Sequence, residues 1–135
     1  MAQATAVATP AATTTNATLE DIAISVFVDA YDQISVSRPF VSIPNDAHGR
    51  TITWTLTHAQ DVEVTWDNPA LSLFGEGAVM EVETVLPNQR RVTWYNIVQG
   101  RSYCYRIHLL KRTGTGPEDY LPLTFDPIIH NDPPP

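Results

Sequence analysis

Hydrophobic and polar residues alternate along most of the chain from Ile22 onward. The clearest case is residues 51–57, in which hydrophobic residues at every second position alternate with threonines. A period of two places successive side chains on opposite faces of a β-sheet, one face buried and the other exposed. The pattern therefore predicts a β-strand over these residues, with Trp54 in the core.

Similar alternation recurs in short segments that proline, glycine and asparagine separate. Besides 51–57, the segments are 22–28, 34–43 with a break at Arg38-Pro39, 62–66, 71–74, 80–86, 91–97, 101–110 and 121–129, the last interrupted by Pro127. We count seven to nine short strands, with Met80, Val82 and Leu86 pointing inward in one of them. No helical pattern lies between them to make parallel crossovers, so we expect an all-β, antiparallel two-sheet sandwich. A partly closed barrel is the alternative.

The two ends of the chain differ in composition from this strand-forming region. Residues 1–18 are mostly alanine and threonine, too small to offset the entropy of ordering them, so we expect a disordered arm. Residues 19–130 form the predicted sandwich domain, and 131–135 a proline-rich tail. The single Cys104 cannot form an internal disulfide, so packing and backbone pairing must hold the domain together.

The segment 91–116 contains a turn followed by a strand rich in tyrosine. Its distinctive residues are Gly100 in the turn and Tyr103, Tyr105, Arg106 and Ile107 in the strand. This pattern resembles the later strands of fibronectin type III and related immunoglobulin-like domains, with Trp54 or Trp66 standing for their core tryptophan. The resemblance implies an immunoglobulin-like sandwich. That fold hosts many unrelated roles, so the resemblance implies no particular activity.

The chain is acidic, with 15 acidic residues against 8 basic ones and a net charge of -7. This charge repels nucleic acid and anionic membrane surfaces. No apolar run approaches the roughly 18 residues that a membrane span needs. The N-terminus also lacks the charged and leucine-rich regions of a conventional signal peptide. We therefore expect a soluble protein without a membrane span, cytoplasmic by default.

The basic residues cluster in one segment, 90–112, which contains six bases and no acid. Aromatic residues are interleaved with them, a combination that binds single-stranded nucleic acid in some proteins. Because the net charge argues against nucleic acid, we favour an anionic partner or pairing with neighbouring acids such as Glu81 and Glu83. The candidate binding surface consists of Arg90, Arg91, Arg101, Arg106, Lys111 and Arg112.

No catalytic, metal or cofactor motif stands out in the sequence, and we predict no catalytic residues and no cofactor. Cys104 and His108 invite a thiol–imidazole interpretation, but four residues along a strand span about 13 Å. The leading hypothesis is therefore a non-enzymatic binding or interaction module, whose partner is another protein and whose oligomeric state stays open.

Two alternatives remain. The first is a metal-binding protein or an enzyme whose site assembles only in the fold, from residues distant in sequence. Its candidate residues are Asp46, His48, His58 and Asp61. The second is a structural or surface component of a bacterial assembly, in which the arm 1–18 and the final prolines act as tethers.

Overall fold

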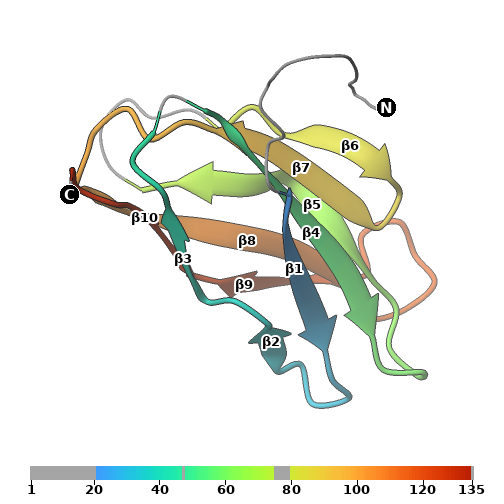
Figure 1. The fold of residues 1–135 in the computed structure, drawn as a ribbon. Helices are drawn as coiled ribbons and strands as arrows, with labels where there is room; N and C mark the ends of the chain where they lie inside the picture. The colour runs from blue at the N-terminus through green and yellow to red at the C-terminus, as the bar shows by residue number, and fades with distance from the viewer. Residues whose placement is uncertain (1–20, 47, 75–79, 135) are drawn as a thin grey trace.

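Ten strands form two β-sheets packed face to face in the computed structural model, which describes residues 21–46, 48–74 and 80–134 (Figure 1). In chain order they are β1 (Asp21–Val28), β2 (Ile34–Val36), β3 (Phe40–Ile43), β4 (Arg50–His58), β5 (Val64–Leu73), β6 (Glu83–Leu86), β7 (Gln89–Trp94), β8 (Ser102–Arg112), β9 (Tyr120–Phe125) and β10 (Ile128–Asn131). None of the described residues belongs to a helix of the length and hydrophobicity that crossing a bilayer requires. The predicted arm 1–18 lies outside the described residues.

The first sheet has the strand order β2-β1-β4-β7-β6. Strands β1 and β4 pair in parallel over eight residues, from Asp21 opposite Thr51 to Val28 opposite His58. Strands β4 and β7 pair antiparallel, and β7 pairs with β6 across a tight turn. Every second residue of β1 is buried, as its alternating sequence predicts.

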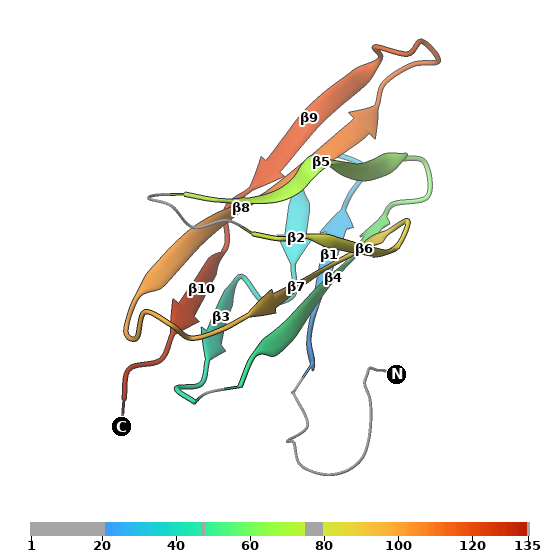
Figure 2. The same cartoon turned by 90° about the horizontal axis from the view of Figure 1, so that it is seen from above.

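The second sheet has the order β3-β10-β8-β5, and β9 also pairs with β8. Strands β9 and β10 keep one register against β8, because Phe125 lies opposite Ile107 and Ile128 opposite Cys104. They therefore run in one line beside β8, interrupted at Pro127, where the sequence predicted the interruption; β10 is covered by β3 on its other side, and β9 is not. Figure 2 shows that β9 and the end of β8 extend beyond the rest of the sandwich.

The predicted two-sheet sandwich is confirmed, and the sheets are not closed into a barrel. The sheets are mixed, however, because β1 pairs in parallel with β4, and β3 with β10. The parallel strands β1 and β4 are joined without a helical crossover, because the chain between them runs through the extended strands β2 and β3. The two strands expected over 62–66 and 71–74 are one strand, β5, whose register shifts between Trp66 and Leu71 around the cis Asn68–Pro69 bond.

The core lies between the sheets and contains all three tryptophans, as the alternation predicted. Each indole N–H has an acceptor: Trp54 donates to the Tyr105 hydroxyl at 3.0 Å, and Trp66 to the Asn88 carbonyl at 2.9 Å. Trp94 donates to the Asn131 side chain at 2.8 Å. Pairing of this kind removes the cost of burying a polar N–H.

One predicted boundary and one predicted side-chain direction need correction. Asn131 belongs to β10 and is fully buried, although we expected a tail from this residue onward. Its side chain accepts the indole proton of Trp94, and this polar partner explains why an asparagine continues a strand. Leu86 was expected to point inward but is exposed, because β6 lies at the free edge of the first sheet.

Candidate interaction surface

Several connections meet at one end of the sandwich. Residues 44–49 join β3 to β4 there, residues 95–101 join β7 to β8, and the chain leaves β10 through residues 132–134. The parallel pairing of β1 with β4 brings Asp21, the first described residue, to the same end, opposite Thr51. We call this the loop end. Loops gathered at one end of a rigid sandwich commonly carry the binding residues of such domains.

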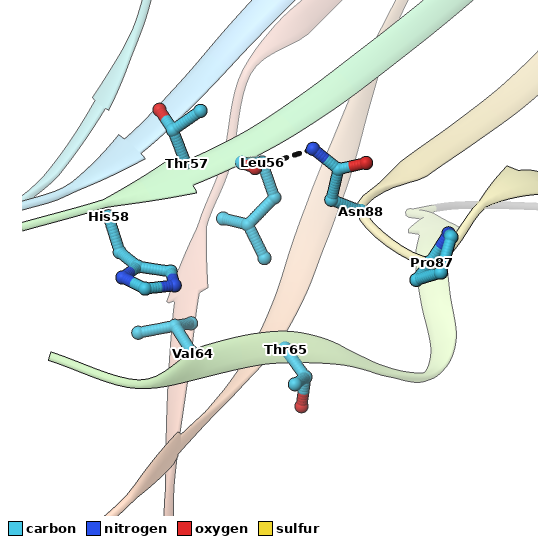
Figure 3. A pocket seen from close by; sticks show the side chains of 7 residues that line it. All are labelled: Leu56, Thr57, His58, Val64, Thr65, Pro87 and Asn88. Atoms are coloured by element: carbon cyan, nitrogen blue, oxygen red, sulfur yellow. Dashed lines mark hydrogen bonds between the residues drawn. The ribbon is translucent and has the colours of Figure 1, made fainter.

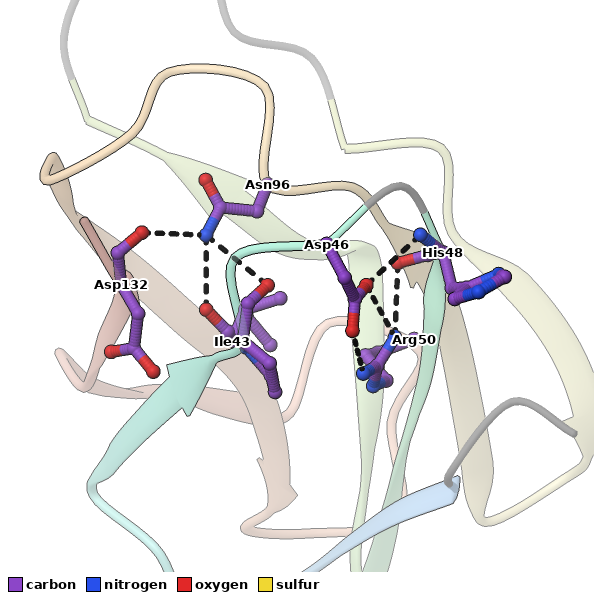
Figure 4. A network of polar contacts seen from close by, with 7 residues as sticks. Ile43, Asp46, His48, Arg50, Asn96 and Asp132 are labelled. Carbon is purple, nitrogen blue, oxygen red and sulfur yellow. Dashed lines mark hydrogen bonds and ion pairs between the residues drawn. The ribbon is translucent and has the colours of Figure 1, made fainter. Parts of the chain in front are cut away.

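The buried side chain of Asn96 anchors the connection between β7 and β8 (Figure 4). Its amide nitrogen donates to the carbonyls of Ile43 at 3.0 Å, Pro44 at 3.3 Å and Asp132 at 2.9 Å. These carbonyls belong to the end of β3 and to the chain that follows β10. One side chain therefore ties three segments of the loop end together.

Asn131 fixes the same connection from the second sheet. Its side-chain oxygen accepts from Trp94, and its side-chain nitrogen donates to the carbonyl of Val98 at 3.1 Å. The Asn131 carbonyl also accepts from the amide of Gly100 at 2.9 Å. Gly100 has a φ of 76°, a left-handed conformation that glycine adopts without strain. The connection 95–101 is thus held at both of its ends.

An ion pair stiffens the neighbouring connection, 44–49. The Arg50 guanidinium donates to both carboxylate oxygens of Asp46, at 3.1 and 2.6 Å, and to the carbonyl of His48 at 3.0 Å (Figure 4). The hydrogen bonds that Asp46 accepts from Arg50, with one from the His48 amide, lower the pKa of Asp46 below its ordinary value. Among the described residues, the buried Nε of Arg50 and Oδ1 of Asn96 have no hydrogen-bond partner.

Large apolar side chains project from this fixed loop. Tyr95 is 53% exposed, Ile97 80% and Val98 45%, and they lie on either side of the buried Asn96. Gly49 supports Tyr95 from the neighbouring connection, because a Cβ at this position would come within 2.8 Å of the tyrosine ring. Exposed apolar residues are ordinarily scattered singly, whereas three within four positions form a patch. We call residues 95–98 the apolar loop.

The apolar loop was not identified from the sequence, which predicted a strand over 91–97 with Tyr95 and Ile97 on one face. Strand β7 ends at Trp94, although the alternation of buried and exposed side chains continues to Ile97. Asparagine is uncommon within strands. Asn96 was therefore the one signal that the strand stops early.

The six basic residues predicted as a binding surface are divided between the two sheets. Arg90 and Arg91 lie on β7 in the first sheet; Arg106, Lys111 and Arg112 lie on β8 in the second, and Arg101 precedes β8. Strands β7 and β8 follow each other in the chain but are not neighbours in a sheet. The segment 90–112 is therefore not a hairpin, and its bases are spread over the sandwich.

Three of these bases pair with acids of the domain. Arg91 contacts Glu83 at 3.0 Å, Arg106 contacts Asp126 at 2.8 Å, and Lys111 pairs with Asp32. The hydrogen bond from Arg106 also lowers the pKa of Asp126. Internal pairing was one of the two interpretations of the basic segment, and it applies to these three residues.

The other three bases contact aromatic rings. Arg101 lies 4.9 Å from the ring centre of Tyr103, and Arg112 4.5 Å from that of Tyr120. Arg90 lies over Trp66 and donates to three backbone carbonyls around the turn between β6 and β7. An anionic partner would have to compete with these contacts within the domain.

The residues proposed for a metal site do not come together. Asp46 and His48 lie at the loop end, whereas His58 and Asp61 lie at the far end of β4 and just beyond it. Eight residue steps along a strand span about 26 Å. The hypothesis of one site from all four residues is therefore wrong. Nor do the described residues contain any other group of three His, Cys, Asp or Glu side chains that could hold a metal ion.

Cys104 and His108 do not form a thiol–imidazole hydrogen bond in the structure. The imidazole of His108 is hydrogen bonded to the Ser72 hydroxyl on β5 at 2.7 Å, and Cys104 is a free, exposed thiol. The arrangement agrees with the separation expected for four residues along one strand.

An open pocket of about 390 Å³ lies at the end of the sandwich opposite the loop end (Figure 3). It is lined by Leu56, Thr57, His58, Val64, Thr65, Pro87 and Asn88. Its walls are mostly apolar, and the imidazole of His58 hydrogen bonds to the carbonyl of Ala59 at 3.0 Å. The lining provides one titratable side chain, which is too few for a paired acid and base.

Comparison of the sequence with models of known protein families gives no match. Comparison with curated proteins likewise gives no significant match.

Proposed function

We propose that this domain acts by binding a protein partner through the apolar loop, and that it catalyses no reaction. The observation that supports the proposal is the 80% exposure of Ile97 beside the buried anchor Asn96. A flexible loop loses conformational entropy when it binds, and a loop fixed in advance loses less. The anchors Asn96 and Asn131 therefore favour binding even though they lie inside the domain.

The expected partner presents an apolar pocket that accommodates Ile97. Full burial of an isoleucine side chain contributes about 1.5–3 kcal/mol, and Tyr95 adds an aromatic side chain of the type enriched at binding hot spots. The chain carries a net charge of -7. A neutral or basic rim around the partner's pocket would avoid charge repulsion.

Site-specific photocrosslinking tests the proposal. A photoreactive phenylalanine replaces Tyr95 in one protein and Tyr31 in another; Tyr31 is 83% exposed at the turn between β1 and β2, away from the loop end. We expect one protein to be captured from Tyr95 and not from Tyr31. The captured protein is then purified, and its affinity for the wild-type domain is compared with that for Ile97→Ser.

The expected loss of affinity for Ile97→Ser is at least tenfold, which corresponds to about 1.4 kcal/mol. Phe27→Ser, an exposed aromatic on the outer face of the first sheet, is the matched control and should bind normally. Equal capture from Tyr31, or unchanged affinity of Ile97→Ser, would overturn the proposal. So would binding of the domain to phosphatidylcholine vesicles that Ile97→Ser abolishes, since the loop would then be a membrane anchor.

The hypothesis of a structural component in a bacterial assembly remains a hypothesis. Its principal tether, the arm 1–18, lies outside the described residues.

A further inference from the structure

A row of exposed apolar side chains crosses the outer face of the second sheet. Phe40 on β3 lies opposite Ile128 on β10, which lies opposite Cys104 on β8. The amide of Phe74, just after β5, donates to the carbonyl of Cys104 at 3.0 Å, which places Phe74 on the far side of Cys104. All four side chains are exposed. We call them the apolar row.

The side chains that flank the middle of the apolar row, on β8 and beside it, are polar, and the acid and the base among them are paired. On one side, the Ser102 hydroxyl is hydrogen bonded to the imidazole of His130 at 2.7 Å, and this ring stacks on Phe40. On the other side, Arg106 pairs with Asp126 and lies 4.7 Å from the ring centre of Phe74. The acid and the base compensate each other, so this face is less repulsive toward a second acidic molecule than the chain's net charge suggests.

Association through the neighbouring free edge is disfavoured by Pro122. The Tyr105 amide donates to the Pro127 carbonyl, and the Thr113 amide donates to the Asp119 carbonyl. These two hydrogen bonds show which residues of β9 and its flanking segments direct their backbone N–H and C=O groups toward β8. Pro122 falls between the positions that bond to β8, so its nitrogen faces the open edge without a proton to donate. Proline at such a position protects an edge strand from pairing with another chain. A second copy that contacts the outer face of the sheet does not use this edge.

We propose that the apolar row is a contact between two copies of this chain, related by a twofold axis that runs along the row. Such an axis places the row of one copy on the row of the other, Cys104 beside Cys104. It also reverses the flanking sides, so that His130 and Ser102 of one copy face Asp126 and Arg106 of the other. An imidazole then meets a carboxylate and a hydroxyl meets a guanidinium, and both contacts are favourable.

The size of the row predicts a weak and reversible dimer. Two half-exposed phenylalanines with an isoleucine and a cysteine contribute about 300 Å² in each copy, where a standard interface buries about 800 Å² in each partner. We therefore expect dimers in the micromolar to millimolar range and monomers in dilute solution. The contact does not involve the apolar loop, so the dimer and the proposed function can each be disproved without the other.

The single cysteine of the chain provides a direct test. Packed sheets lie about 10 Å apart, too far for an unstrained disulfide, so a short bismaleimide is the suitable reagent. We expect bismaleimidoethane to join two wild-type chains at Cys104 with a yield that rises with protein concentration. Phe40→Ser should lower the yield at least tenfold. The matched control Phe27→Ser, on the outer face of the other sheet, should leave it unchanged.

Sedimentation equilibrium of the wild type and both variants completes the test. The average mass of the wild type and of Phe27→Ser should rise with concentration, and that of Phe40→Ser should stay at the monomer. The proposal is overturned if the wild type remains a monomer into the millimolar range, or if Phe40→Ser and wild type crosslink equally. Circular dichroism of Phe40→Ser checks that the variant is folded, which is expected because Phe40 is 52% exposed.

Discussion

Replacing Tyr105 with phenylalanine should destabilise the core by a predictable amount. The Tyr105 hydroxyl accepts the indole proton of Trp54 at 3.0 Å, and both side chains are fully buried. Phenylalanine keeps the edge-to-face ring contact, whose centres are 5.5 Å apart, but leaves the indole N–H without an acceptor. An unpaired buried donor costs about 1–3 kcal/mol. We expect the free energy of unfolding to fall by about 2 kcal/mol at pH 7.

The same substitution should have a smaller effect in alkaline solution. Burial raises the pKa of Tyr105 from its ordinary value of 10.0 to about 12. Above pH 10 the unfolded chain therefore loses the phenol proton that the folded chain retains, and the stability of the wild type falls with rising pH. For a pKa difference of two units, the loss amounts to about 1.4 kcal/mol at pH 11. The phenylalanine variant has no such proton to lose.

Urea unfolding at pH 7 and pH 11, followed by tryptophan fluorescence, measures both effects. The deficit of Tyr105→Phe relative to wild type should shrink from about 2 to less than about 1 kcal/mol between these values of pH. Other titrating groups are common to both proteins and cancel in the difference. Tyr31→Phe, which alters an exposed hydroxyl, should match the wild type at pH 7. A deficit that is the same at both values of pH would refute the reasoning.

Three further substitutions test the loop end. Asn131→Ala removes the acceptor of Trp94 and should lower the free energy of unfolding by about 2–4 kcal/mol, measured by urea unfolding. Gly100→Ala places a side chain at a φ of 76° and should lower the free energy of unfolding by about 1 kcal/mol in the same assay. An unchanged free energy of unfolding would contradict the left-handed conformation of this residue. Gly49→Ala should displace the ring of Tyr95, seen as changed tyrosine resonances by NMR, with little change in stability because the ring can swing into solvent.

Most of the secondary structure could be predicted from the sequence because most strands show their own alternation. Alternation marks the buried face of β1, β4 and β8 residue by residue, and Pro127 marks the break between β9 and β10. The three tryptophans fall on inward positions of the alternation in β4, β5 and β7. A period of two depends only on neighbouring residues, so it can be observed without knowledge of the fold.

Strand pairing depends on contacts between distant residues, and the sequence did not reveal it. Nothing in the alternation of β1 indicates that β4 lies beside it in parallel. For the same reason the apolar row was not predicted: Phe40, Ile128 and Cys104 become neighbours only through the register of β3, β10 and β8. The basic segment was expected to be one hairpin, but its strands β7 and β8 belong to different sheets.

The contacts that the basic residues already make within the domain explain why the apolar loop is the better candidate for a binding site. Arg91, Arg106 and Lys111 already have acidic partners within the domain, and a new anionic partner would replace existing interactions at little net gain. Ile97 is 80% exposed to water, so burying it against a partner would contribute nearly the full hydrophobic free energy of its side chain. The buried anchor Asn96 holds this side chain outward. The six basic residues of the segment 90–112 already make contacts within the domain, whereas the apolar loop exposes apolar surface at a fixed position.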